Sequence, residues 1–192
     1  MARPKLPWLV VVVIILCAIV VVVTWPKDTI AKREAVVRKL TELRLRYEQD
    51  PTDQEALNGI RKMINAKTSF ARTRACVTLG ELGPLAEPAV DDLVAALRSG
   101  DGYVEREAAI ALGKIGPGAN EAVGPLTAML DREYIDVASF SAESLGQIGK
   151  SALSAVPALQ KASRSSDQSL AYHARKALLH LEKSELMDGT GE

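Results

Sequence analysis

Residues 107–119 read EAAIALGKIGPGA, and related stretches stand at a fixed distance on either side of them. The chain reads RACVTLGELGPLA 33 residues earlier and FSAESLGQIGKSA 33 residues later. All three copies contain a leucine followed by a glycine, and a second glycine three residues after the first. No insertion or deletion separates the copies, so the spacing identifies an internal repeat with a constant period.

The repeat continues into a second half of each unit. Four further columns keep the 33-residue period: Ala86, Ala119 and Ala152; Ala89, Ala122 and Ala155; Val90, Val123 and Val156; and Leu93, Leu126 and Leu159. Within each half, apolar residues recur at spacings of three and four, as in Ala75, Leu79 and Leu82, which predicts two helices per unit. One such pair cannot bury its apolar faces, so the units are expected to stack into an α-solenoid.

Two glycine columns predict details of this stacking. One column follows the first helix, where a left-handed residue commonly ends a helix: Gly83, Gly116 and Gly149. The other column lies inside the first helix: Gly80, Gly113 and Gly146. A glycine inside a helix costs about 1 kcal/mol relative to alanine, so we expect close approach of a neighbouring helix at these positions.

The stretch 107–119, continued by AVGPL at residues 122–126, resembles a HEAT repeat. It is most similar to the short bacterial subtype also found in phycobilisome lyases. The resemblance covers residues 71–183 and implies an all-α fold, an α-solenoid of HEAT-like helical hairpins, without specifying an activity. Three residues of the third unit depart from the pattern: Phe140, Ser141 and Lys150. Strict regularity is therefore not expected in that unit, although the fold is.

A segment without charges precedes the repeats. Residues 6–25 contain no charged side chain and, at about 1.5 Å per residue, would reach roughly 30 Å, the thickness of the bilayer hydrocarbon. Trp8 and Trp25 stand near its ends, where tryptophan favours the membrane interface. We therefore predict a basic tail at residues 1–5 and one transmembrane helix at 6–25, which makes the protein a single-pass protein of the cell membrane.

Cleavage and orientation of this segment stay open. Arg3 and Lys5 also fit the basic region of a signal peptide, but no small residues stand at cleavage spacing after the apolar run. The excess of Lys and Arg after the segment favours a cytoplasmic repeat domain, whereas the basic region before it favours the opposite side.

Residues 26–66 are expected to form a juxtamembrane helix and a degenerate capping repeat. Residues 30–47 form an amphipathic pattern, and residues 54–65 place Leu57, Ile60 and Ile64 one period before Val90, Leu93 and Leu97. Capping is favoured over a coiled-coil stalk because the apolar stripe is too short for several heptads. The repeats are assigned to 67–183 and a disordered polar tail to 184–192.

Composition and motifs exclude several functions. The chain has 24 basic and 24 acidic residues, so no basic field is available for nucleic acid. His173 and His180 share a helix face but are too few for a metal site. Cys76 aligns with Ala109 and Ala142 and is interpreted as a buried small residue. We expect a protein that is not an enzyme and has no cofactor, metal or small-molecule substrate.

The resemblance implies that the second helices line the concave side of the solenoid. In these helices the positions opposite the buried Val90, Leu93 and Leu97 columns point outward, since each residue is rotated by about 100° from the one before it. We interpret the outward residues as a candidate protein-binding face. Its members are Asp92, Ala95, Ser99, Ala128, Arg132, Lys161 and Ser165, with Pro125 and Ala158 at equivalent places. The alternative is that the alanines only allow adjacent helices to approach each other.

The leading hypothesis is a membrane-anchored HEAT-repeat protein that acts as a protein–protein interaction adaptor or scaffold. The alternative, implied only by the repeat subtype, is a phycobilin-lyase-like or chaperone-like factor for chromophore attachment. Nucleic-acid binding is a third hypothesis, but Asp92 and Asp131 interrupt the basic surface that it would need.

Overall fold

The computed structural model describes the backbone of residues 26–188 and the side chains of residues 29–185. The predicted transmembrane segment, with Trp8 and Trp25, lies outside the described residues. Among the helices of the described part, none is both long and apolar enough to cross a bilayer. The chain divides into two units, residues 1–39 and residues 40–192, and all the repeats belong to the second unit.

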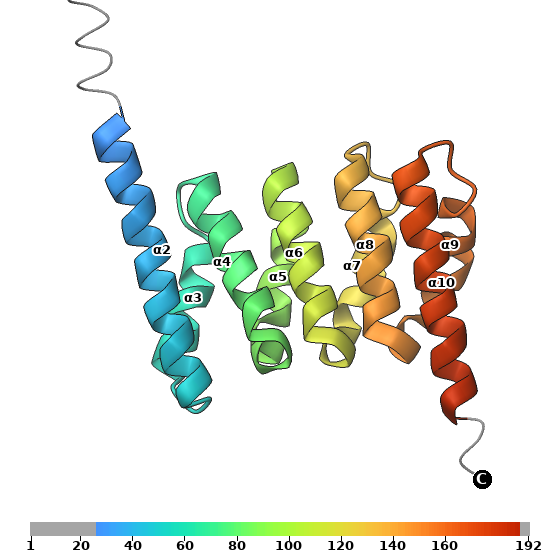
Figure 1. The fold of residues 1–192 in the computed structure, drawn as a ribbon, viewed down its shortest axis with the longest axis horizontal. Helices are drawn as coiled ribbons and strands as arrows, with labels where there is room; N and C mark the ends of the chain where they lie inside the picture. Colours follow the sequence, from blue (N-terminus) through green and yellow to red (C-terminus); the bar gives the residue numbers. More distant parts are fainter. Residues whose placement is uncertain (1–25, 189–192) are drawn as a thin grey trace, which may run out of the picture. The chain divides into compact units, whose positions relative to one another are not determined.

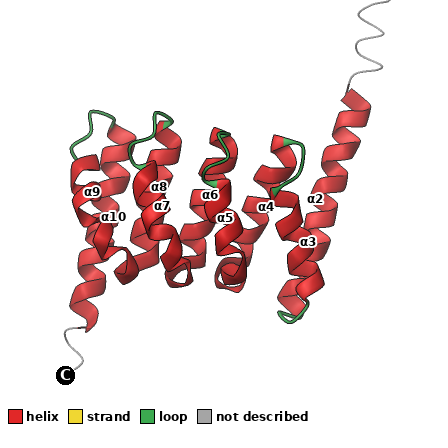
Figure 2. Cartoon of the chain, turned by 180° about the vertical axis from the view of Figure 1, so that it is seen from behind, coloured by secondary structure: helices red, strands yellow, loops and turns green. Residues whose placement is uncertain are grey.

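The described residues form helices and loops, without a strand (Figures 1 and 2), which confirms the all-α class. The α-helices are α2 (Pro26–Gln49), α3 (Gln54–Ile64), α4 (Ser69–Leu82), α5 (Val90–Ala96), α6 (Gly102–Ile115), α7 (Val123–Met129), α8 (Ile135–Ile148), α9 (Val156–Ala162) and α10 (Gln168–Asp188). Three 3-10 segments connect the two helices of each unit: Gly83–Ala89, Gly116–Ala122 and Gly149–Ala155. Each of these connections has 7 residues.

The predicted period is present in the backbone itself. The first helices α4, α6 and α8 begin at Ser69, Gly102 and Ile135, and each has 14 residues. The second helices α5, α7 and α9 begin one period apart as well, and each has 7 residues. Within the second unit of the chain, the first helices stand side by side in one row and the second helices lie in another (Figure 1). The loops between repeats follow one edge of these rows (Figure 2).

Both glycine predictions are confirmed. The glycines that follow the first helices have positive φ angles, 56° at Gly83, 74° at Gly116 and 75° at Gly149, which a residue with a side chain rarely adopts. Inside α8, a Cβ built at Gly146 would lie 2.8 Å from the Cα of Ala177 on α10. The glycine therefore permits an approach of the two backbones that alanine would prevent.

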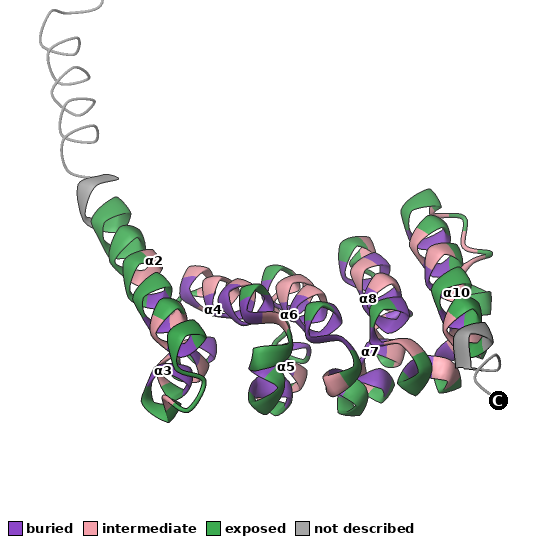
Figure 3. Cartoon of the chain, turned by 60° about the horizontal axis from the view of Figure 1, so that its bottom comes forward, coloured by how far each residue is buried: buried purple, intermediate pink, exposed green. Residues whose placement is uncertain are grey.

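The core lies between the two rows of helices, where the buried faces meet (Figure 3). Its members include six repeated leucines that have no exposed surface: Leu79, Leu112 and Leu145 from the first helices, and Leu93, Leu126 and Leu159 from the second. Leu178 continues the first column on α10 but is only half-buried. No second helix follows α10 in the described part of the chain, which explains the difference.

An additional helical hairpin precedes the repeats in the second unit of the chain. From α2 it contains the buried Leu40, Leu43 and Tyr47, and from α3 the buried Leu57 and Ile60. Close packing joins the two helices, since a Cβ at Gly59 would lie 2.9 Å from Leu43 Cδ1.

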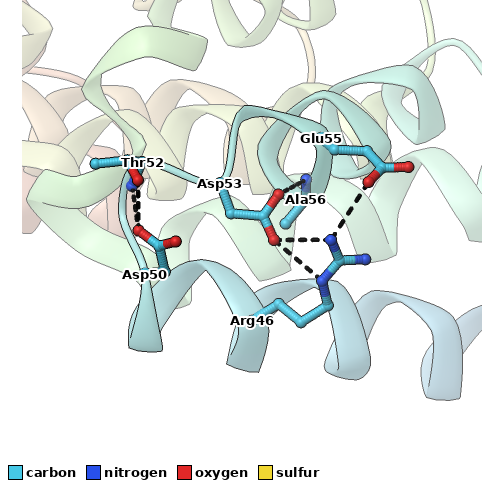
Figure 4. A network of polar contacts seen from close by, with 6 residues as sticks. All are labelled: Arg46, Asp50, Thr52, Asp53, Glu55 and Ala56. Carbon is cyan, nitrogen blue, oxygen red and sulfur yellow. Dashed lines mark hydrogen bonds and ion pairs between the residues drawn. The ribbon is translucent and has the colours of Figure 1, made fainter.

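The turn of this hairpin is held by polar contacts (Figure 4). Asp53 Oδ1 accepts the backbone N–H of Ala56 at 2.9 Å and so caps α3. Its other oxygen lies 2.8 Å from Arg46 Nη2, and Arg46 also reaches Glu55 at 3.4 Å. Asp50 accepts the hydroxyl of Thr52 at 2.6 Å, and this bond lowers the pKa of Asp50. Side chains of the turn thus cap α3 and connect it to the end of α2.

At the other end, α10 runs past the expected repeat boundary at residue 183 and continues to Asp188. The sequence after Ser184 reads Glu-Leu-Met, and all three residue types favour helix, which accounts for the extension. The remaining residues, 189–192, lie outside the described part.

Candidate protein-binding groove

The structure places the predicted face on the second helices and on the loops that follow them. Four of its members are exposed and three are half-buried: Ala95, Ser99, Ala128 and Lys161 in the first group, and Asp92, Arg132 and Ser165 in the second. Exposure is thus uneven along the face, and its members serve different roles.

A groove of about 270 Å³ brings one part of the predicted face together. It lies between the C-terminal end of α7 and helix α9, and its lining residues are Leu130, Asp131, Arg132, Ala158, Lys161, Ala162, Ser165 and Leu170. Three predicted residues, Arg132, Lys161 and Ser165, therefore meet in one hollow. The other four, Asp92, Ala95, Ser99 and Ala128, do not line it.

The floor of the groove is apolar and its rim is charged. Leu130 and Leu170 are each only 6% exposed, so their surfaces close the bottom of the hollow. At the rim, Lys161 Nζ lies 2.7 Å from Asp131 Oδ1, and both side chains are 73% exposed. Such an exposed pair contributes between about 0 and 1 kcal/mol, so a partner can separate the two charges at little cost.

Arg132 is held in place by the buried carboxylate of Glu105, which the sequence analysis did not identify. Glu105 on α6 has no exposed surface, and Arg132 Nη2 donates to its two oxygens at 2.7 and 2.8 Å. The N–H of Gly100 donates to the same carboxylate at 3.0 Å. The hydrogen bond to Glu105, and then its negative charge, raise the pKa of Arg132. This fixed guanidinium forms a wall of the groove.

Asp92 has a different role at the opposite end of the face. Its carboxylate forms an ion pair with Arg61 Nε and so joins α5 to α3. This predicted residue therefore contributes to the contact between neighbouring hairpins. The sequence pattern that predicted the face does not separate these two roles.

Cys76, His173 and His180 have different surroundings. Burial raises the pKa of Cys76 to about 12, so its thiol stays protonated at neutral pH. His173 lies 3.3 Å from Glu143, while His180 is exposed. Within the described residues, no group of three or more His, Cys, Asp or Glu is placed to hold a metal ion.

Comparison with known proteins agrees with this architecture. The family described as HEAT repeats matches residues 68–144 and residues 90–179, which together cover more than half of the chain. The chain belongs to the HEAT-repeat family. No curated protein matches it significantly.

Two crystal structures of engineered proteins from the Northeast Structural Genomics Consortium are similar in fold. The first has a TM-score of 0.58 and 26% identity, covering 69% of this chain and 64% of its own. The second has a TM-score of 0.56 and 23% identity, covering 84% of this chain and 46% of its own. This chain thus spans less than two thirds of either structure, and the likeness supports a helical-repeat scaffold.

Proposed function

We propose that the protein is a membrane-anchored HEAT-repeat adaptor, without catalytic activity, that holds a protein partner in the groove between α7 and α9. The observation that carries this proposal is the convergence of Arg132, Lys161 and Ser165 on a hollow with an apolar floor. Apolar floors with a few placed polar groups are typical of binding sites. HEAT solenoids present such surfaces to protein chains, which supports a protein as the occupant.

The contacts of the groove suggest how a partner is recognised. Leu130, Ala162 and Leu170 offer apolar area to a side chain that enters the hollow. Asp131 and Lys161 offer one charge of each sign at the rim, so they can orient a polar segment without adding net charge. Arg132 is already engaged by Glu105 and acts as a rigid wall.

The membrane anchor is part of the proposal and rests on the sequence. Residues 6–25 lack charges over a length that fits the bilayer hydrocarbon, and tryptophans stand near both ends. The side of the membrane that the repeats occupy is left open. The chromophore-attachment alternative rests on the resemblance of the repeats alone.

Site-directed photo-crosslinking in intact cells tests the groove. A photoreactive phenylalanine analogue at Ala158 should capture a discrete protein partner, because this side chain lines the hollow. The matched control carries the analogue at the exposed Ser154, which does not line it. Equal capture from both positions, or none from Ala158, would contradict the proposed groove.

Alkaline carbonate extraction tests the anchor separately. The full chain should stay with the membrane pellet, and a variant without residues 6–25 should enter the supernatant. A protease-accessible tag at residue 192 then reports the side of the membrane. Release of the full chain by carbonate would refute the anchor and leave the groove untouched.

A further inference from the structure

A second hollow, of about 400 Å³, lies between the N-terminal ends of α6 and α8. Its lining residues are Asp101, Gly102, Tyr103, Arg106, Tyr134, Asp136 and Val137. None of them lines the groove between α7 and α9. The loops between repeats run along one edge of the helix rows (Figure 2). The hollow lies at these loops, because Asp101 and Tyr134 belong to them. It therefore does not depend on the proposed function of the groove.

The residue before α8 breaks a pattern that the other first helices keep. Thr68 caps α4, Asp101 caps α6, and Asp167 accepts the N–H of Leu170 at the start of α10. Tyr134 occupies the same column before α8 and makes no capping bond. A capping side chain stabilises the start of a helix, and a tyrosine side chain does not make this bond. The start of α8 is therefore less stable than it would be with a capping residue, and an exposed ring stands there instead.

Two tyrosine rings thus face solvent at the hollow. Tyr103 is 68% exposed and Tyr134 is 58% exposed. The Tyr134 ring rests against Gly102, where a Cβ would lie 3.5 Å from Tyr134 Cδ1. Aromatic side chains that are exposed beside a cavity offer large, rigid contact surfaces, and they are enriched where proteins bind partners.

The charges around the rings leave the hollow negative. Arg106 is matched by Glu107, to which it donates two hydrogen bonds, and Asp101 is matched by Arg72 at 3.0 Å. Asp136 is 73% exposed and forms a long ion pair with Arg106, whose Nη1 lies 3.9 Å from Asp136 Oδ2 and which also pairs with Glu107. The carboxylate of Asp136 is therefore the least compensated charge that lines the hollow.

One of the two rings already contacts a cation of the protein. The guanidinium carbon of Arg106 lies 5.8 Å from the centroid of the Tyr103 ring, within the range of a cation–π contact. A cation brought by a partner would meet the second ring, that of Tyr134, and the exposed carboxylate of Asp136. An acidic side chain would instead be repelled by this carboxylate.

We propose that this hollow binds a lysine or arginine side chain from an extended segment of a partner protein. The aliphatic part of that side chain lies between the Tyr103 and Tyr134 rings, and its charge is directed toward Asp136. The volume is in the range of ordinary ligand pockets, roughly 300–1,000 Å³, and accommodates one long side chain with its neighbours.

An NMR titration of the full chain in detergent micelles tests this binding. The chain contains four tyrosines, and ¹³C-labelled rings report each one. The probe is a capped tetrapeptide Gly-Arg-Pro-Gly, compared with Gly-Glu-Pro-Gly. Tyr103 and Tyr134 should shift with the arginine peptide only, whereas Tyr172, which is 62% exposed and outside the hollow, should not shift. Equal shifts with both peptides, or equal shifts of Tyr172, would overturn the proposal.

Free guanidinium at the same concentration distinguishes a polypeptide from a small cation. If it shifts both rings as much as the peptide does, the site takes small cations and the proposed partner segment is wrong. Two variants complete the test. Asp136→Asn should weaken the arginine peptide about threefold, and Tyr134→Thr should weaken it about fivefold.

Tyr134→Thr also separates binding from folding. It introduces a capping residue like Thr68 at the start of α8, so the chain should unfold at a higher temperature. The affinity for the arginine peptide should fall in the same variant. Tyr172→Ala is the matched control and should leave the affinity unchanged. If Tyr134→Thr keeps full affinity, or if Tyr172→Ala loses as much, the Tyr103–Tyr134 site is refuted.

Discussion

The second repeat unit, residues 102–134, and the third, residues 135–167, have helices of equal length but accommodate polar groups differently. The second buries Glu105 and matches it with Arg132. The third has alanine at the equivalent position, Ala138, and instead buries three serines: Ser139, Ser141 and Ser144. The backbone period is thus compatible with either solution. Buried polar groups in proteins generally have a hydrogen-bond partner.

The serines of the third unit meet this condition unequally. Ser144 Oγ donates to the carbonyl oxygen of Ala109 at 2.7 Å and so joins α8 to α6. Ser139 lies 3.2 Å from the hydroxyl of Ser169. Ser141 has no exposed surface and no hydrogen-bond partner for its hydroxyl. The buried polar group of the second unit thus forms a charged pair, whereas the third unit buries neutral hydroxyls, one of which has no partner.

Glu105→Ala should have the largest effect, because it removes the partner of Arg132 and the acceptor for Gly100 N–H. We expect a loss of about 3 kcal/mol in the free energy of unfolding, measured by urea denaturation of the full chain in mild detergent. Adding Arg132→Ser copies the third unit, which has Ala138 and Ser165, and should recover most of this loss. Failure of the double variant to recover would show that the two units are not interchangeable.

Gly146→Ala comes next and tests how tightly the third unit packs on α10. The added methyl would meet the backbone of Ala177, so the helices must separate, and we expect a loss of about 2 kcal/mol after the gain in helix propensity. Gly80→Ala is the control, since its Cβ would lie 3.1 Å from Ala111 Cα and needs a smaller shift. Equal unfolding midpoints for the two variants would argue against the tighter packing.

Ser141→Ala should stabilise the chain by about 1 kcal/mol, because it removes a buried hydroxyl that has no partner. Alanine already stands at the equivalent Ala75 and Ala108, so the space fits it. Ser144→Ala is the control and should destabilise, since it breaks the bond to Ala109. A loss of stability in Ser141→Ala, seen as a lower melting temperature, would mean that the hydroxyl has a partner after all.

The local pattern of the sequence was sufficient to predict the repeat, the helix pairs and both glycine columns. These features depend on spacing along the chain, and a constant period of 33 residues makes them visible. The Tyr134 position also carried a signal, because it stands in a column with Thr68, Asp101 and Asp167. That signal was missed, since capping only becomes evident once helix starts are known.

The groove and the Glu105–Arg132 pair could not be predicted from the sequence and became evident only in the three-dimensional structure. Helical rotation placed Asp92, Arg132 and Lys161 outward, but it does not say where two neighbouring helices leave a hollow between them. Glu105 and Arg132 stand 27 residues apart, on a helix and on a loop of the same unit. No pattern along the chain shows that this carboxylate is buried beneath that guanidinium.

The smallest effect on stability is expected at the rim of the groove. Exchanging the charges, by Asp131→Lys together with Lys161→Asp, keeps the exposed pair and should change the free energy of unfolding by less than about 0.5 kcal/mol. A partner that contacts Asp131 and Lys161 through opposite charges of its own should nevertheless bind the exchanged pair more weakly, so crosslinking from Ala158 should fall. Each single variant places like charges together and should show the same loss. Unchanged crosslinking in a fully folded exchange variant would mean that the apolar floor alone holds the partner, and that the rim charges serve only solubility.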